Sequence, residues 1–150
     1  MAQSLADIVL HIVFSTKDRR PWILPEIEQE LFQYICGVAH NLKSPVVRIN
    51  GVEDHIHILL SFGRTISISE LIAELKASSS RWIKAKGDKY HTFCWQGGYG
   101  VFSVSRPSIE GAIKYIAKQK EHHKTISFRD EFLAMLQRAK IEYDEKYLWD

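Results

Sequence analysis

A stretch in the middle of the chain, DHIHILL at positions 54–60, carries two histidines separated by one isoleucine. Because side chains alternate across a β-strand, His55 and His57 share one face while Ile56 and Ile58 share the other. The isoleucine face is the natural core face, which leaves two imidazoles with Cα atoms roughly 7 Å apart on the opposite face. Two such imidazoles can bind one cation through neutral ring nitrogens. Taken alone, an ordinary pair of exposed or hydrogen-bonded histidines is an equally good interpretation.

A tyrosine and a glutamine form a second candidate group near the end of the chain. Tyr115 and Gln119 are four positions apart, so a helix places them on one face, about 6 Å apart along its axis. That face is displaced from the apolar stripe of Ile109, Ile113 and Ile116, so core packing requires neither residue. Glutamine can offer an oxygen to a hard cation, and a tyrosine beside a metal site is a possible nucleophile. For an arbitrary helix, a half-buried aromatic with a polar neighbour is the simpler interpretation.

Hydrophobic periodicity predicts the elements that position these residues. We expect strands at 8–14, 46–52, 54–62, 92–95 and 101–105, and helices from 26, from 68, from about 108 and over about 128–143. Ser67 and Glu70 form a capping box at the second helix, and the Ser108 hydroxyl is expected to cap the third. The glycine-rich stretch 96–100 indicates a bulge or a close approach of the backbone to another group, nucleic acid included.

This order of elements, β-α-β-β-α-β followed by a further helix, is typical of a ferredoxin-like split βαβ unit. We therefore predict an α+β fold, a ferredoxin-like or RRM-like sandwich. Its antiparallel sheet would carry helices on one face, leave the other face open and be followed by an extra C-terminal helix. His55 and His57 would lie on the open face. The length of 150 residues fits one domain over residues 1–150.

Composition excludes several classes of protein. Hydrophobic residues make up 45% and charged residues 25% of the chain, which does not favour disorder. No apolar run approaches the roughly 20 residues of a spanning helix, and we interpret the start MAQSLADIVLHIVF as a strand and not a signal peptide. The isolated Cys36 and Cys94 match no close-spaced zinc pattern and are expected to be buried free thiols. We expect a cytoplasmic protein without a membrane partner.

Charge gives weaker guidance, since the net charge is only +2. Lys17, Arg19 and Arg20 lie together in one loop. Lys76 and Arg81 lie on the polar side of the second predicted helix. All five are candidates for contacts with DNA phosphates, and an ordinary solvated face remains the alternative.

Together these parts resemble a known family. The His55-Ile56-His57 run matches the His-hydrophobic-His (HUH) motif. YIAKQKEHH at 115–123 resembles the Tyr-x-x-x-Gln segment of the small single-tyrosine HUH transposases of bacterial insertion sequences, whose relatives include REP-associated tyrosine transposases. The resemblance extends to HIVFSTK at 11–17, to WQGGYGVFSVS at 95–105 and to Ser127-Phe128, and so covers nearly the whole chain. The His-x-His pattern alone is weak, whereas the ordered set is specific.

The resemblance implies transesterification on single-stranded DNA. Tyr115 would attack a phosphodiester, form a 5′-phosphotyrosine link and leave a free 3′-hydroxyl. His55, His57 and Gln119 would hold Mg²⁺ or Mn²⁺. Such transposases act on DNA hairpins at the ends of their element. They work as homodimers in which the tyrosine helix of one subunit can serve the histidine pair of the other. The apolar residues of the last helical segment, Phe132, Leu133 and Leu136, are expected either to mediate pairing or to pack on their own domain.

For two further residues, the sequence leaves two possible roles open. Asp54 either orients a ligating histidine through a hydrogen bond or closes the hairpin. His122, with its neighbour His123, either faces the DNA or caps the end of the helix. His11 on the first strand receives no role.

Three other functions compete with transposition. The first is a ferredoxin-like module that binds nucleic acid without catalysis, which would need exposed strand aromatics. A zinc hydrolase built on the His-x-His pair would want a third histidine or carboxylate ligand and would not need Tyr115. The third is a host-adopted HUH nuclease that acts on repeat palindromes.

Overall fold

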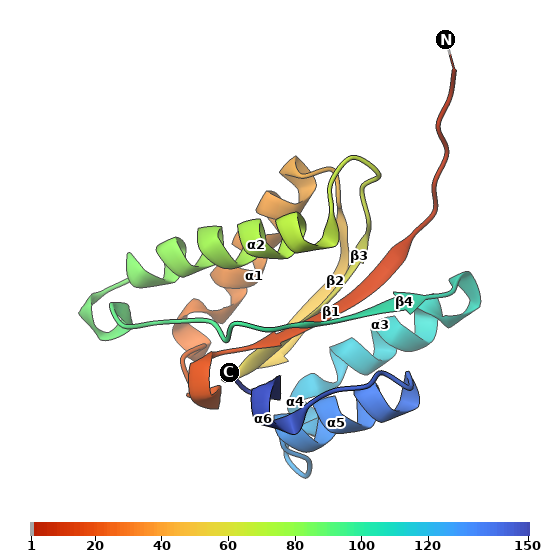
Figure 1. Ribbon diagram of the computed structural model, residues 1–150. Coiled ribbons are helices and arrows are strands. Elements are labelled where there is room, and N and C mark those ends of the chain that lie inside the picture. The colour runs from red at the N-terminus through yellow and green to blue at the C-terminus, as the bar shows by residue number, and fades with distance from the viewer. Residues whose placement is uncertain (1) are drawn as a thin grey trace.

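The computed structural model describes residues 2–150 and contains a four-stranded antiparallel sheet between two layers of helices (Figure 1). The strands are β1 (Val9–Ser15), β2 (Val46–Val52), β3 (His55–Ser61) and β4 (Gly100–Val104), in the order β2-β3-β1-β4. The two central strands are β1 and β3, and both are almost entirely buried. This topology confirms the predicted α+β, ferredoxin-like class.

The first helical layer contains α1 (Pro25–Asn41) and α2 (Ile68–Lys84). These helices pack on the face of the sheet that carries Ile56 and Ile58, and form the main apolar core with it. The predicted start of α2 is confirmed, because the Ser67 hydroxyl accepts a hydrogen bond from the backbone N–H of Glu70.

The second helical layer covers the face that was expected to be open, so that expectation is wrong. It contains α3 (Ile109–Ala117), α4 (Gln119–His122), α5 (Phe128–Arg138) and α6 (Glu145–Leu148). In Figure 1 these helices lie on the opposite side of the sheet from α1 and α2. Val9 and Leu59 pack against Ile116, and Val13 packs against Phe132. The central strands are therefore buried on both faces, as in a sheet that is covered on both sides.

Strand register places the two histidines beneath this second layer. In β3, His55 pairs with Ser15 and His57 pairs with Val13 of β1. Both imidazoles are fully buried. They point away from the isoleucine core, as alternation predicts, into a polar space between the sheet and helices α3–α5.

Several local expectations need correction. Residues 92–95 form no strand, because they meet β1 only at the single bridge between Thr16 and Trp95. Ser108 does not cap α3, since a 3-10 turn, η3 (Arg106–Ser108), precedes that helix. The helix that carries Tyr115 is interrupted at Lys118, and α5 ends at Arg138 because Lys140 adopts a positive φ of 56°. Two further 3-10 turns are η1 (Lys17–Arg19) and η2 (Asp88–Tyr90). Cys94 is exposed, not buried.

The glycine-rich stretch supports α5. A Cβ atom at Gly100 would lie 2.5 Å from the Phe132 ring, so this position needs glycine for α5 to pack on β4. Nearby, the Lys76 ammonium donates hydrogen bonds to the carbonyls of Gln96 (2.7 Å) and Gly98 (2.8 Å). The close approach is therefore made by a helix of the same chain.

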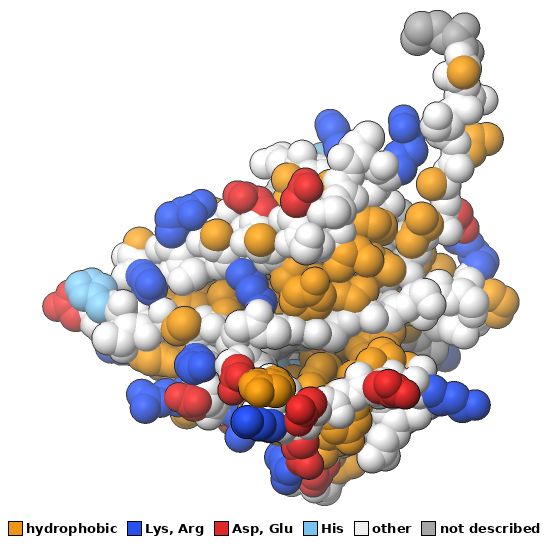
Figure 2. All heavy atoms as spheres, in the orientation of Figure 1, with side chains coloured by type: hydrophobic (Ala, Val, Ile, Leu, Met, Phe, Trp, Pro, Cys, Tyr) orange, Lys and Arg blue, Asp and Glu red, His pale blue; other side chains and the backbone are white. Residues whose placement is uncertain are grey.

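The surface is mixed in charge. On the face drawn in Figure 2, Lys and Arg side chains are interspersed with Asp and Glu, and apolar side chains gather between α2 and β4. Within residues 2–150, the helices are too short or too polar to cross a membrane.

Candidate active site

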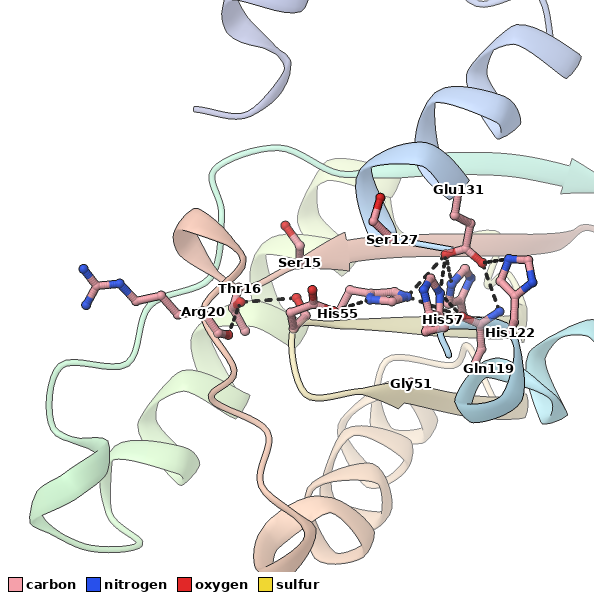
Figure 3. A network of polar contacts seen from close by, with 12 residues as sticks. Ser15, Thr16, Arg20, Gly51, His55, His57, Gln119, His122, Ser127 and Glu131 are labelled. Atoms are coloured by element: carbon pink, nitrogen blue, oxygen red, sulfur yellow. Dashed lines mark hydrogen bonds and ion pairs between the residues drawn. The ribbon is translucent and has the colours of Figure 1, made fainter. Parts of the chain in front are cut away.

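The carboxylate of Glu131 on α5 is the centre of a buried polar cluster (Figure 3). Its Oε1 lies 2.9 Å from His57 Nε2, 3.3 Å from His55 Nε2 and 3.1 Å from His123 Nε2. Its Oε2 accepts hydrogen bonds from the Tyr115 hydroxyl and from Gln119 Nε2 (3.1 Å). Two strand histidines, the α4 glutamine and the α3 tyrosine therefore converge on one carboxylate.

Two of the histidines use their second ring nitrogen, Nδ1, in a hydrogen bond to an oxygen outside the cluster. His55 Nδ1 lies 2.7 Å from the Asp54 carboxylate, and His123 Nδ1 lies 2.7 Å from the carbonyl of Ile126. Both acceptors lack hydrogens, so each Nδ1 must carry one. A neutral imidazole has a single N–H, which leaves a lone pair on each Nε2.

Those two lone pairs point at oxygen atoms. Gln119 Oε1 lies 3.3 Å from His55 Nε2 and 2.9 Å from His123 Nε2, and Glu131 Oε1 is close to both. Lone pairs that face oxygen acceptors need a proton or a cation between them. The arrangement therefore fits a metal ion, since it favours bound positive charge at the point where these atoms meet.

The donor set also fits a divalent metal. One ligand atom each from His55, His57, His123 and Glu131 lie within 4.8 Å of one another. Three imidazoles and one carboxylate are ligands that Mn²⁺ and Zn²⁺ accept, whereas Mg²⁺ prefers a shell made of oxygen atoms. Gln119, which was predicted to be a ligand, offers its oxygen at the same place.

Tyr115 lies at the edge of this cluster and is half-buried. Burial raises the pKa of its phenol, and the hydrogen bond to the Glu131 carboxylate raises it further. The side chain lines a cavity of about 580 Å³ together with Lys114, Lys118 and His122. The phenol is thus close to the cluster on one side and accessible from outside on the other.

Burial and pairing set the charges of the cluster. Burial lowers the pKa of His57 to about 4, although the Glu131 carboxylate opposes the shift. Burial also acts to lower the pKa of His55, but the Asp54 and Glu131 carboxylates, which accept hydrogen bonds from its protonated ring, outweigh burial, so the pKa of His55 is raised. Glu131 is itself desolvated, yet the histidines around it hold its pKa well below the usual value. In the metal-free protein, the carboxylate is therefore ionised.

Sequence reasoning gave no role to two residues at this site, His11 and Glu131. His11 Nε2 lies 2.8 Å from His57 Nδ1, and burial lowers the pKa of His11 to about 3. Glu131 received no role because it belongs to a helix beyond the resemblance segments. The available signal was its place on α5, four residues after Ser127 and on the same side as the apolar Phe128 and Phe132.

The basic residues are distributed unevenly around the site. Arg19 lines a cavity of about 720 Å³ with Asp54 and His123, and the exposed Lys17 and Arg20 belong to the same segment. His122 lies beside Tyr115, with ring centroids 5.5 Å apart.

Lys76 and Arg81 do not belong to this group. Both lie on α2, across the sheet from the histidines, and the Lys76 ammonium is occupied by two carbonyls. Contacts of these two residues with DNA, which stay a prediction, would therefore lie away from the histidine cluster. Arg81 is exposed, which fits both a contact with DNA and an ordinary surface charge.

Residues 4–119 match the family model described as IS200-like transposases. Because this match covers most of the sequence, the chain belongs to that family. It is 23% identical over 116 residues to the ISDra2 transposase TnpA of Deinococcus radiodurans, over 74% of this chain and 83% of that protein. The expected resemblance to tyrosine transposases of insertion sequences is confirmed.

Two solved structures share the fold. One is a protein of Deinococcus radiodurans R1 assigned as a transposase, with a TM-score of 0.62, 21% identity, and coverage of 79% of this chain and 98% of that chain. The other is a REP-associated tyrosine transposase bound to a REP hairpin, with a TM-score of 0.61, 16% identity, and coverage of 84% and 76%.

Proposed function

We propose that this transposase is a metal-dependent enzyme that nicks and rejoins single-stranded DNA through a 5′-phosphotyrosine intermediate at Tyr115. One observation carries the proposal: Tyr115, Gln119 and the pair His55 and His57 meet at a single buried cluster within one chain. Chance patterns of His-x-His and Tyr-x-x-x-Gln have no reason to converge in this way.

In the proposed reaction, the chain positions the nucleophile and the scissile phosphate. The phenol oxygen of Tyr115 attacks phosphorus, and the 3′-oxygen leaves. His55, His57 and Gln119 would hold Mn²⁺ or Mg²⁺, and His123 and Glu131 would complete the donor set. When bound, the cation supplies positive charge to a non-bridging phosphate oxygen. Asp54 fixes the orientation of His55 through the hydrogen bond to Nδ1.

We propose single-stranded DNA with a hairpin as the substrate. The solved REP-associated relative is bound to a REP hairpin, which supports this choice. Basic residues flank both cavities beside the cluster: Arg19 borders one, with Lys17 and Arg20 in the same segment, and His122 borders the other with two lysines. These side chains are candidates to bind phosphates on either side of the cleavage point.

We also propose that the protein acts as a homodimer. Phe132 and Leu136, which were considered for pairing, are buried within their own chain, so they do not support an interface. The edge strand β4 supports an interface, because the backbone groups on its outer side pair with no further strand of the described sheet. In a dimer, active sites shared between subunits are an alternative to the arrangement within one chain.

One gel experiment tests this function against its competitors. Labelled hairpin DNA is incubated with Mn²⁺ and the protein, and the products are separated under denaturing conditions. We expect a covalent protein–DNA band that disappears in Tyr115→Phe. Binding without a covalent band would instead identify a binding module.

The same gel addresses the zinc hydrolase. That alternative gains support from His123 and Glu131, which supply the third histidine and the carboxylate that it requires. Metal-dependent cleavage that survives Tyr115→Phe would favour it. Cleavage that needs both Tyr115 and the metal excludes it.

A further inference from the structure

The helix that carries the candidate nucleophile is held at its end by a side chain of the sheet. Helix α3 ends at Ala117 and α4 begins at Gln119, on the other side of the break at Lys118. Asn50 of β2 donates from Nδ2 to the carbonyl oxygens of Ile116 (2.9 Å) and Ala117 (3.3 Å). In an unbroken helix, these carbonyls would accept from backbone N–H groups four residues later. The Asn50 amide therefore satisfies carbonyls that the break leaves at the end of α3.

Contacts on both sides fix the orientation of this amide. Lys120 Nζ lies 3.2 Å from Asn50 Oδ1, and an ammonium can only donate, so the amide oxygen faces the lysine and the amide nitrogen faces the carbonyls. The same ammonium donates to the carbonyl of Gly51 (3.2 Å) and to the buried carboxylate of Glu28 on α1 (2.5 Å). The break between α3 and α4 is thus tied to the edge strand β2 and, around that edge, to the first helical layer.

Asn50 stands beside the candidate metal ligands. It is paired with His57 in the register of β2 and β3, so the two side chains lie on the same face of the sheet. Asparagine is depleted in β-strands, and the strand itself therefore gives no reason for an asparagine at this position. Its contacts with two carbonyls and an ammonium do give a reason.

The break at Lys118 decides how the phenol and the glutamine of the site meet. A straight helix would separate Tyr115 and Gln119 by about 6 Å along its axis. Here the Tyr115 hydroxyl and Gln119 Nε2 both donate to the same oxygen of Glu131. Helix α3 is short, at nine residues, and is anchored in the core by Ile116. A helix of this length depends on tertiary contacts for its position, and the Asn50 amide supplies one of them next to Tyr115.

We propose that Asn50 is a positioning residue for the reaction: its amide fixes the end of α3 and so holds the phenol oxygen of Tyr115 in place for attack on the scissile phosphate. The inference rests on the proposed function of Tyr115 as nucleophile. Asn50 acts through the carbonyls of Ile116 and Ala117 and needs no contact with DNA or metal. A reacting atom that is misplaced by about 1 Å can lose about 100-fold in rate. A loosened α3 should therefore slow the chemical step while DNA binding persists.

The test compares Asn50→Asp with the matched control Asn41→Asp. An ionised aspartate has the shape of asparagine but no hydrogen to donate, so it cannot bind the two carbonyls. Asn41 is exposed at the end of α1, and its variant adds the same charge without touching α3. A second variant, Asn50→Ala, removes the amide without adding a charge. Single-turnover adduct formation is measured at saturating hairpin DNA and Mn²⁺, and the dissociation constant of the DNA is measured by fluorescence anisotropy in EDTA.

We expect both Asn50 variants to form the adduct about 100-fold more slowly than the native protein. Their DNA dissociation constants should stay within about threefold of native, as for an interaction that matters in the transition state, and Asn41→Asp should react at the native rate. A fluorinated tyrosine at position 115 reports the position of the ring. Its fluorine NMR resonance should move or broaden in the Asn50 variants and stay unchanged in Asn41→Asp. A purely structural contribution of Asn50 would lower thermal stability and leave the saturated rate and this resonance unchanged.

Two results would overturn the inference: a loss of rate below about tenfold in either folded Asn50 variant, or a slower rate with an unmoved fluorine resonance. Failure of the proposed function looks different, because then the native protein itself forms no adduct or Tyr115→Phe still forms one. Thermal unfolding identifies a variant that has not folded. If Asn50→Asp does not fold, Asn50→Ala gives the same two measurements and decides alone.

Discussion

At the scale of single residues, the hydrogen-bond partners of the histidines explain more of this site than the residue types do. Asp54 and the Ile126 carbonyl each fix a hydrogen on the outer nitrogen of an imidazole, so the inner nitrogens of His55 and His123 present lone pairs to the cluster. This is the usual way in which a protein fixes the tautomer of a ligating histidine. The hydrogen bond from His55 Nδ1 to Asp54 is the contact that the proposed orienting role of Asp54 requires.

The first prediction concerns Asp54. In Asp54→Asn we expect the Mn²⁺ dissociation constant to rise about 10- to 100-fold, since the His55 ring loses its charged partner. Titration with Mn²⁺, followed by paramagnetic resonance, measures this change. Glu53→Gln, which alters the neighbouring carboxylate of the same turn, should bind Mn²⁺ like the native protein. Equal affinities in all three proteins would remove Asp54 from the site.

The second prediction concerns His11, whose pKa burial lowers from 6.5 to about 3. Below pH 6.5 this histidine is protonated in the unfolded chain but stays neutral in the folded chain. Its contribution to the free energy of unfolding is therefore fully present above pH 6.5 and is lost as the pH falls toward 3. In His11→Gln, the free energy of unfolding between pH 6 and pH 4.5 should depend less steeply on pH, by about 1 kcal/mol per pH unit. Urea unfolding in EDTA measures it, with the exposed His91→Gln as control. Parallel slopes for native protein and His11→Gln would refute the assignment.

At the scale of elements, α5 decides whether the site is complete, because it alone supplies Glu131. The helix begins at a capped residue, Ser127, whose side chain accepts from the backbone N–H of Asp130. It is held over the sheet by Phe128, which stacks on His55 with ring centroids 4.3 Å apart, and by Phe132, which lies over Gly100.

The third prediction tests that support. Gly100→Ala places a methyl group 2.5 Å from the Phe132 ring, so we expect a loss of about 1–3 kcal/mol in the free energy of unfolding. Because Phe132 must shift, Mn²⁺ affinity should fall together with stability. Gly98→Ala is the matched control, as its added carbon meets nothing within 4 Å. Unchanged stability in Gly100→Ala would show that α5 does not depend on this close approach.

At the scale of the whole molecule, the sequence predicted the sheet and its first helical layer because each depends on a local period. Alternation in residues 54–60 placed His55 and His57 on a common face, and Ser67 marked the start of α2. The helices of the second layer were predicted, but the face that they cover was not, because α3–α5 meet the sheet through a few separate residues, such as Ile116 and Phe132, and no period indicates that face. Glu131 is 74 residues from His57, and such distant contacts leave no local signal.

The fourth prediction concerns assembly. Light scattering during size-exclusion chromatography should give twice the chain mass of 17.4 kDa, since β4 offers an unpaired edge for association. A mass of one chain across the micromolar range, in the presence and in the absence of hairpin DNA, would contradict the homodimer.

The most direct test of the central claim, that Tyr115 is the nucleophile, is to map the covalent bond. Hairpin DNA that the native protein cleaves in Mn²⁺ is trapped on the protein, both are digested, and the modified peptide is sequenced by mass spectrometry. We predict a nucleotide 5′-phosphate attached to the phenol oxygen of Tyr115, and no modified peptide in Tyr115→Phe. A nucleotide attached to any other residue, or DNA cleaved without any covalent peptide, would contradict the account.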